Sequence, residues 1–163
     1  MNNYFKISIT FLCILMVSPV CAEEAITKPP LDVGLIHTSN VRTIFKINTA
    51  REKDGVNRGL YYVRSVLEQY EALGVPSSNL KISAVFLGDG TDALLKGKKQ
   101  RNNQALIKDL IAKGVSIEIC RESMVARKIE RPGLIEGVKI VPSAFLRVID
   151  LQQSGYAWIM VSG

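Results

Sequence analysis

Blocks of two different hydrophobic patterns alternate along most of this chain. Residues 80–87 are almost continuously apolar, as in strands that are buried on both faces of a parallel sheet. Residues 56–74 instead place apolar side chains at every third or fourth position, which predicts an amphipathic helix that ends at Gly74. The chain therefore contains both kinds of element that a mixed α/β protein needs.

The same two patterns predict the order of the elements. Strands are expected at about residues 41–47, 80–87, 115–120, 137–142 and 156–161. Helical segments are expected at about residues 56–74, 93–97, 103–113, 123–128 and 143–153, and a loop is expected at Asp54-Gly55. This alternation predicts the α/β class, as a three-layer α/β/α sandwich with a mainly parallel five-stranded sheet.

The first 22 residues have the pattern of a secretory signal peptide. Lys6 precedes an apolar run over residues 7–17, and Val20 and Ala22 are small residues at the cleavage positions. The run is shorter than the roughly 20 residues of a membrane span, so we expect no stable membrane span after its removal. The expected organisation is a signal peptide at 1–22, an N-terminal arm at 23–38 and one domain at 39–163, in an exported, periplasmic protein.

The charges change this picture little. The net charge is +6, and the basic residues are dispersed except for a cluster from Lys96 to Arg101. A dispersed charge favours solubility, and aromatic residues do not alternate with basic ones, so no nucleic acid partner is expected. The cluster itself fits a solvated loop, or a surface for an acidic partner or anionic lipid.

The cysteines supply the main candidate for chemistry. Cys13 and Cys21 fall in the leader, so Cys120 is the only thiol of the processed chain and has no partner for an internal disulfide. Cys120 closes a predicted strand just before a short helix, where backbone N–H groups favour a thiolate. In one interpretation it is a nucleophilic or sulfur-carrying thiolate, with its pKa lowered by the helix start and by Arg121 or Arg127. In the other it is a small buried hydrophobe.

A second candidate is the turn that follows the strand at residues 80–87. Its binding candidates are Gly88, Asp89, Gly90 and Thr91, because α/β proteins place ligands where strands end and helices begin. An ordinary tight turn explains the same residues. His37 is the only histidine, so no His-based metal cluster can form, and a cysteine hydrolase would need His37 to reach Cys120. No metal-ligand spacing stands out, and no metal and no cofactor are expected.

Three stretches of the C-terminal half resemble the DsrE/DsrF-like family of sulfur-relay proteins, in particular its exported members. They are GVSIEIC at residues 114–120 with Ser123 and Met124 after it, GVKIVPS at residues 137–143, and LQQSGYAWI at residues 151–159. The last is very similar to the family's terminal L-Q-x-x-G-Y-A-[YW]-I. The three stretches occur in the family's order.

The resemblance implies a five-stranded sandwich that assembles into trimers or hexamers. It also implies that Cys120 accepts a persulfide sulfur and passes it on, as a sulfurtransferase-like carrier with a sulfur donor or acceptor protein as partner. The expected site is Cys120 with Arg121, Ser123 and the turn at residues 88–91. The alternative is a non-catalytic ligand-binding or assembly module in which Cys120 is structural.

Overall fold

The computed structural model describes residues 30–162 of the chain. The predicted signal peptide at 1–22 and the first part of the arm lie outside the described residues. Of the described residues, 30–34 and 35–162 belong to two separate units of the chain. Residues 30–34 are irregular. The second unit contains all the elements described below.

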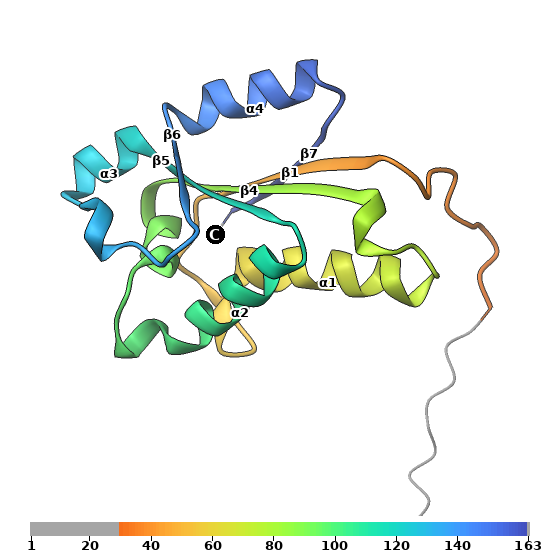
Figure 1. Ribbon diagram of the computed structural model, residues 1–163, viewed down its shortest axis with the longest axis horizontal. Coiled ribbons are helices and arrows are strands. Elements are labelled where there is room, and N and C mark those ends of the chain that lie inside the picture. The colour runs from red at the N-terminus through yellow and green to blue at the C-terminus, as the bar shows by residue number, and fades with distance from the viewer. Residues whose placement is uncertain (1–29, 163) are drawn as a thin grey trace, which may run out of the picture. The chain divides into compact units, whose positions relative to one another are not determined.

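A five-stranded sheet forms the centre of this second unit (Figure 1). The strands follow the order β6-β5-β4-β1-β7, and every neighbouring pair is parallel. Their bounds are β1 Val41–Ile47, β4 Leu80–Phe86, β5 Ser116–Cys120, β6 Lys139–Val141 and β7 Ala157–Val161. The predicted parallel sheet is confirmed, and its five strands lie within two residues of the predicted bounds.

Helices cover both faces of the sheet. Helices α1 (Arg58–Ala72) and α2 (Arg101–Ala112) lie on one face, and α4 (Ala144–Gln153) lies on the other (Figure 1). The short helix α3 (Arg121–Arg127) follows directly after β5. Four 3₁₀ segments complete the fold: η1 Ser77–Asn79, η2 Gly88–Leu94, η3 Lys98–Gln100 and η4 Arg131–Gly133. The three-layer sandwich is thus confirmed.

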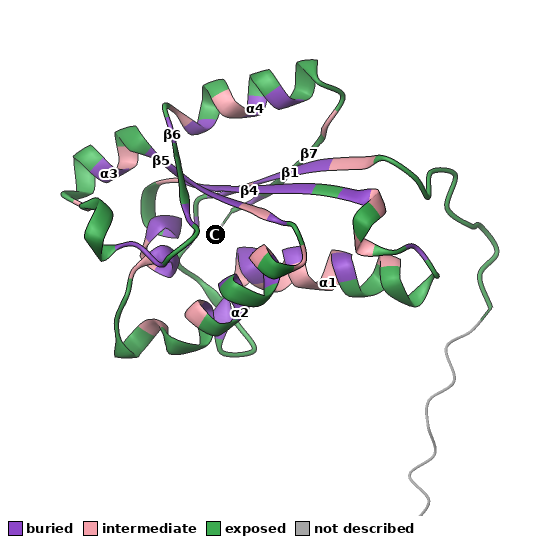
Figure 2. Cartoon of the chain, viewed as in Figure 1, coloured by how far each residue is buried: buried purple, intermediate pink, exposed green. Residues whose placement is uncertain are grey.

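The core has one part on each face of the sheet. The larger part packs α1 and α2 against the sheet and includes Phe45, Leu60 and Ile107. The smaller part lies under α4 and includes Val85 and Cys120. Figure 2 shows the corresponding pattern, in which the central strands are mostly buried and the helices are exposed on their outward sides. Cys120 therefore belongs to the α4 side of the sheet.

Three local predictions need correction. Residues 52–57 form a hairpin of β2 (Glu52–Lys53) and β3 (Val56–Asn57), because Asp54 and Gly55 adopt the positive φ values that a tight hairpin turn requires. The 3₁₀ helix η2 begins at Gly88, so the expected turn is itself helical. The basic cluster forms η3 and the start of α2 rather than a loop.

No helix within residues 30–162 is both long enough and apolar enough to cross a membrane.

Candidate functional site

Cys120 lies at the carboxyl edge of the sheet, where the chain changes from strand to helix. It is the last residue of β5 and the N-cap of α3, and it pairs with Val141 of β6. Its side chain is only 4% exposed. The thiol is thus held at a strand-to-helix junction, as its sequence position predicts, but it lies below the surface.

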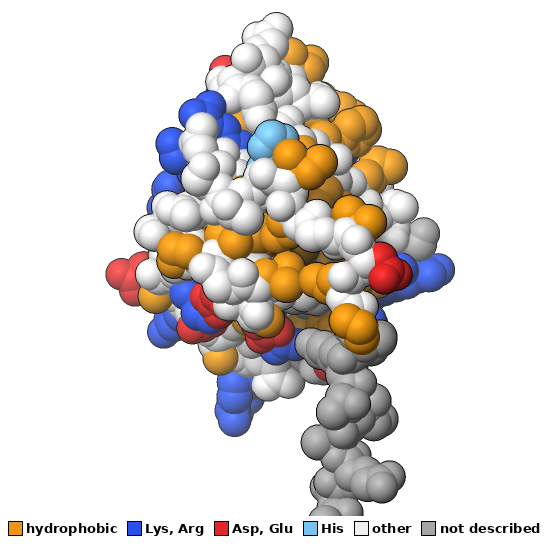
Figure 3. Space-filling view, turned by 90° about the vertical axis from the view of Figure 1, so that its right-hand side faces the viewer, with side chains coloured by type: hydrophobic (Ala, Val, Ile, Leu, Met, Phe, Trp, Pro, Cys, Tyr) orange, Lys and Arg blue, Asp and Glu red, His pale blue; other side chains and the backbone are white. Residues whose placement is uncertain are grey.

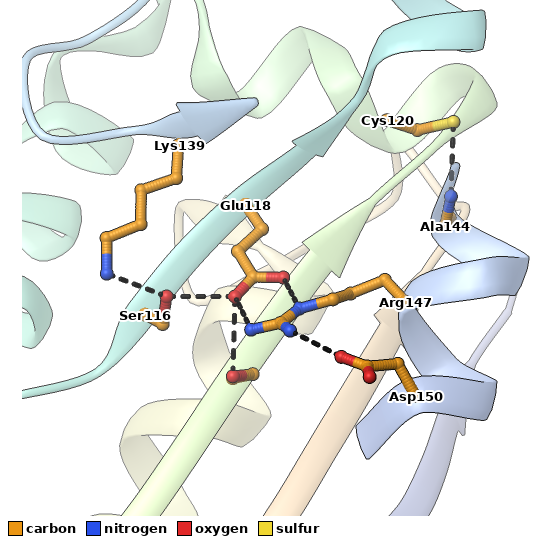
Figure 4. A network of polar contacts seen from close by, with 8 residues as sticks. Ser116, Glu118, Cys120, Lys139, Ala144, Arg147 and Asp150 are labelled. Carbon is orange, nitrogen blue, oxygen red and sulfur yellow. Dashed lines mark hydrogen bonds and ion pairs between the residues drawn. The ribbon is translucent and has the colours of Figure 1, made fainter. Parts of the chain in front are cut away.

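Hydrogen-bond donors from two helices surround the sulfur. The Ala144 N–H in the first turn of α4 donates to Cys120 Sγ at 3.4 Å (Figure 4). Burial raises the pKa of the Cys120 thiol, but hydrogen bonds from the N–H and hydroxyl of Ser123 and from the N–H groups of Ala144 and Glu122 lower it. The hydrogen bonds outweigh the burial, so the pKa lies below the ordinary value of a thiol.

The surroundings of Cys120 are otherwise apolar. Cys120 belongs to one buried cluster with Ile44, Val85 and Val141 of the sheet and with Ala144 and Val148 of α4. This setting combines features of both sequence interpretations. The thiol is buried among hydrophobic residues, and it is also supplied with the N–H donors that stabilise a thiolate.

The turn after β4 lies beside α3. The Gly88 N–H donates to Ser123 Oγ at 3.1 Å, and Thr91 Oγ1 donates to the Gly88 carbonyl at 2.7 Å. Gly90 is packed so closely that an added Cβ would lie 2.7 Å from the Ile47 carbonyl oxygen. Of the predicted binding residues, the structure therefore links Gly88 and Thr91 to the Cys120 region through Ser123.

The two arginines near Cys120 have other partners. Arg127 binds Asp89 at 2.8 Å and Asp92 at 2.6 Å, and Arg121 forms an exposed pair with Glu122. Neither arginine contributes to the lowered pKa of Cys120, which arises from hydrogen bonds. The lowered pKa of Cys120 is thus accounted for by hydrogen bonds, whereas carboxylates engage the guanidinium groups of Arg121 and Arg127.

A small hollow of about 120 Å³ opens beside η2. It is lined by residues of η2, α2 and the hairpin region: Ala50, Glu52, Asn57, Asp92, Ala93, Gln100 and Asn103. Cys120 does not line it. A small ligand bound there would not touch the thiol, so the hollow and the thiol are separate features.

The sequence did not predict the buried polar network around Glu118. Glu118 is 1% exposed, and both of its carboxylate oxygens bind Arg147 of α4, each at 2.9 Å (Figure 4). The signal was an acidic residue in the middle of an apolar strand. Such a residue needs a partner when it is buried, but the sequence does not show which cation supplies it.

His37 lies far from the thiol along the strand direction. It is exposed and precedes β1, so it belongs to the amino edge of the parallel sheet, whereas Cys120 ends β5 at the carboxyl edge. The histidine, pale blue, is visible on the face at the amino edge (Figure 3). Within one chain, His37 and Cys120 therefore do not form a catalytic pair. Among the described residues, no group of three or more His, Cys, Asp and Glu side chains could hold a metal ion.

The fold and the site define a class of protein. It is a parallel α/β sandwich with a thiol at the carboxyl end of β5. Residues 37–161 match the model of the DsrE/DsrF-like family. The chain belongs to this family, which is associated with sulfur relay. A search of curated proteins finds no match.

The solved structures that are similar to this chain include the following two. A protein of unknown function, MTH1491 from Methanobacterium thermoautotrophicum, aligns with a TM-score of 0.62 and 21% identity over 74% of this chain and 99% of that one. The ychN protein from E. coli aligns with a TM-score of 0.57 and 21% identity over 74% of this chain and 100% of that one. These similarities support the fold.

Proposed function

We propose that this chain is an exported sulfur carrier in which Cys120 accepts a sulfane sulfur as a persulfide and passes it on. The observation that carries the proposal is the set of hydrogen-bond donors around Cys120 Sγ, which lower the pKa of the thiol despite its burial. Sulfur transfer needs a thiolate as nucleophile. Membership of a family associated with sulfur relay supports the same chemistry.

The proposed reaction is a thiolate exchange that needs no external oxidant. The Cys120 thiolate attacks the outer sulfur of a donor persulfide, a bond forms between Sγ and that sulfur, and the donor's S–S bond breaks. Both electrons of the broken bond leave with the donor thiolate, which takes up a proton. Cys120 is left as a persulfide, and the reverse exchange with an acceptor thiol releases the sulfur.

The donors around Cys120 have a clear part in this exchange. The N–H groups of Ala144, Ser123 and Glu122 stabilise the negative charge before the attack. They would also stabilise that charge when Cys120 is regenerated as the leaving thiolate. A lower thiol pKa makes a better leaving group, so the same contacts support both acceptance and release.

Intact mass spectrometry tests the proposal. The protein is incubated with inorganic polysulfide, and we expect one added sulfur atom that dithiothreitol removes. Cys120→Ser is the matched control and should remain unmodified. An unmodified wild-type protein, or equal modification of Cys120→Ser, would contradict a persulfide on Cys120.

A second candidate function is an assembly or ligand-binding module with a structural Cys120, and the 4% exposure of the thiol favours it. Alkylation by iodoacetamide separates the two. A sulfur carrier should react while folded, and a structural thiol should react only after unfolding in urea.

We also propose that the protein is a homo-oligomer, a trimer or hexamer, because α4 and β7 expose several large apolar side chains: Phe145, Leu146, Ile149, Trp158 and Met160.

Export follows from the leader pattern at residues 1–22 and belongs to the same proposal. Expression of the full chain in a bacterial host should give a periplasmic protein whose mass begins at Glu23. A cytoplasmic protein that retains Met1 would contradict export, although it would leave the proposed chemistry of Cys120 intact.

A further inference from the structure

Two contacts join the same strand to the same helix on the α4 side of the sheet. Glu118 and Cys120 are two residues apart in β5, so their side chains point to the same face. Ala144 and Arg147 are three residues apart in α4 and share one side of that helix. The Cys120–Ala144 contact and the Glu118–Arg147 contact therefore form two adjacent ties between β5 and α4 (Figure 4).

The Glu118–Arg147 tie has a fixed geometry. Arg147 Nε donates to Glu118 Oε2 and Arg147 Nη2 donates to Oε1, both at 2.9 Å. A bidentate pair of this kind fixes distance and orientation together. The apolar contacts that also hold α4, such as Val148 and Leu151 on the sheet, are non-directional and do not specify where the helix sits along β5.

Further polar groups hold the carboxylate in place. Ser116 Oγ donates to Glu118 Oε1 at 2.9 Å, and Ser83 Oγ lies 3.5 Å from the same oxygen. Lys139 Nζ donates to Ser116 Oγ at 3.2 Å, and on the outer side Arg147 Nη1 donates to Asp150 at 3.0 Å. The carboxylate thus approaches Arg147 from a position fixed by neighbouring strands.

We propose that the Glu118–Arg147 pair is a positioning device for the thiol, which holds the first turn of α4 so that the Ala144 N–H points at Cys120 Sγ. The proposal rests on the proposed function, because it takes Cys120 to be the group that reacts. Glu118 and Arg147 are positioning residues, since neither is in hydrogen-bond contact with Sγ in the described part of the chain. Without the Glu118–Arg147 pair, α4 shifts along β5. The Ala144 N–H then no longer donates to the Cys120 thiolate.

The charged groups on the elements around Cys120 define the electrostatic background of this proposal. They are Arg42 and Lys46 on β1, Lys81 on β4, Asp89 and Asp92 on η2, Glu118 on β5, Arg121, Glu122 and Arg127 on α3, Lys139 on β6, and Arg147 and Asp150 on α4. Among the residues that the structure describes, Glu118–Arg147 is the only ion pair between β5 and α4. Removing Arg147 takes away a positive charge, and removing Glu118 takes away a negative one. A purely electrostatic effect would therefore shift the pKa of Cys120 in opposite directions, whereas loss of the positioning contact would shift it in the same direction.

Thiolate absorbance near 240 nm, followed against pH, measures the effect. The full chain is used, and the curve of Cys120→Ser is subtracted so that the remaining signal belongs to Cys120. The test variants are Arg147→Met and Glu118→Gln, which remove opposite charges. The control is Asp150→Asn, which breaks the exposed contact of the same arginine and leaves the pair with Glu118 intact.

We expect the titration midpoint to move to higher pH in both Arg147→Met and Glu118→Gln, and to stay in place in Asp150→Asn. Below the midpoint, the thiolate fraction should fall about threefold to tenfold, the range expected for one hydrogen bond. Arg147→Lys should show an intermediate shift, because a lysine keeps the charge and loses the fork of donors. Opposite shifts in the two test variants would indicate a simple charge effect and overturn the proposal, as would unchanged midpoints.

A double variant covers the case in which a single change unfolds the protein. Glu118→Met with Arg147→Met leaves no unpaired buried charge, and such apolar replacements are often neutral for stability. It should fold, as judged by its Tm, and still show the shifted midpoint. An unshifted midpoint in the folded double variant overturns the proposal.

The midpoint of the thiol titration does not depend on sulfur transfer. A wild-type protein that takes up no sulfur but shows these shifts refutes the proposed function alone, and sulfur uptake without shifts refutes the positioning role alone.

Discussion

Ser123 connects Gly88 to Cys120 across the carboxyl edge of the sheet. Its hydroxyl accepts a hydrogen bond from the Gly88 N–H at 3.1 Å, and the same hydroxyl and the Ser123 N–H lower the pKa of the Cys120 thiol. One serine in the first turn of α3 therefore joins the end of β4 to the candidate nucleophile. The turn after β4 is thus part of the thiol's environment.

The Ser123→Ala variant tests this link. It removes one donor to Sγ, so the pKa of Cys120 should rise and the thiolate fraction below the midpoint should fall about threefold to tenfold. The rate of alkylation by iodoacetamide, measured against pH, reports the change. Ser65→Ala on α1 removes a hydroxyl that accepts from Gln69 and should leave the pH profile unchanged. An equal profile in Ser123→Ala and the wild type would show that the hydroxyl has no effect on the thiol.

The lowered pKa of Cys120 also predicts how stability depends on pH. Between the lowered pKa of the folded state and the ordinary pKa of the unfolded thiol, the unfolded chain binds more protons, so the free energy of unfolding rises with pH. The contribution is fully present above the ordinary thiol pKa and is lost as the pH falls through the lowered one. Its slope cannot exceed about 1.4 kcal/mol per pH unit for one group.

Urea unfolding of the wild type and Cys120→Ser at a series of pH values measures this contribution, because the serine does not titrate. The difference in unfolding free energy should grow in favour of the wild type as the pH increases. A difference that shrinks with pH would indicate a thiol whose pKa is raised by burial. That outcome would support the structural interpretation of Cys120.

Gly90 should tolerate no side chain. A Cβ at this position would lie 2.7 Å from the Ile47 carbonyl oxygen, which is backbone and cannot move aside without distorting β1. We expect Gly90→Ala to lower the free energy of unfolding by about 1–3 kcal/mol, as overpacking does. Gly133→Ala is the matched control, because a Cβ there meets nothing within 4 Å. Equal urea midpoints for the two variants would contradict the close approach.

Local patterns in the sequence were enough to predict the layers of this fold. The continuous apolar run of β4 and the three- and four-residue spacing of α1 depend only on neighbouring residues, and both elements form where expected. The junction at Cys120 is local in the same sense. The contacts that tune the thiol are not, since Ala144 lies 24 residues further along the chain.

Long-range partners also explain what the sequence did not predict. Arg121 and Arg127 are close to Cys120 in sequence, but the carboxylates that engage Arg127 come from η2, 35 and 38 residues away. The buried acid of β5 finds Arg147 across 29 residues. Proximity in sequence therefore gave no indication of the partners of Arg127 or of the ion pair between β5 and α4.

The oligomer prediction depends on the α4–β7 surface, defined as Phe145, Leu146, Ile149, Trp158 and Met160. Each of these side chains is about half exposed or more. Trp158 pairs with Ile44 on β1, so it lies on the α4 side of the sheet, and Lys46 Nζ is 4.0 Å from the centre of the Phe145 ring. Large exposed apolar side chains that gather on one face often mark protein–protein contacts, so we expect a second copy of the chain to cover this surface.

Light scattering should accordingly give a mass that is a multiple of the monomer mass. Leu146→Glu places a charge on this surface and should reduce the mass, because an unpaired carboxylate is costly to bury. Leu73→Glu, at an exposed position after α1 on the other face of the sheet, is the matched control and should keep the wild-type mass. A monomeric wild type would refute the oligomer, and equal effects of the two variants would place the interface elsewhere.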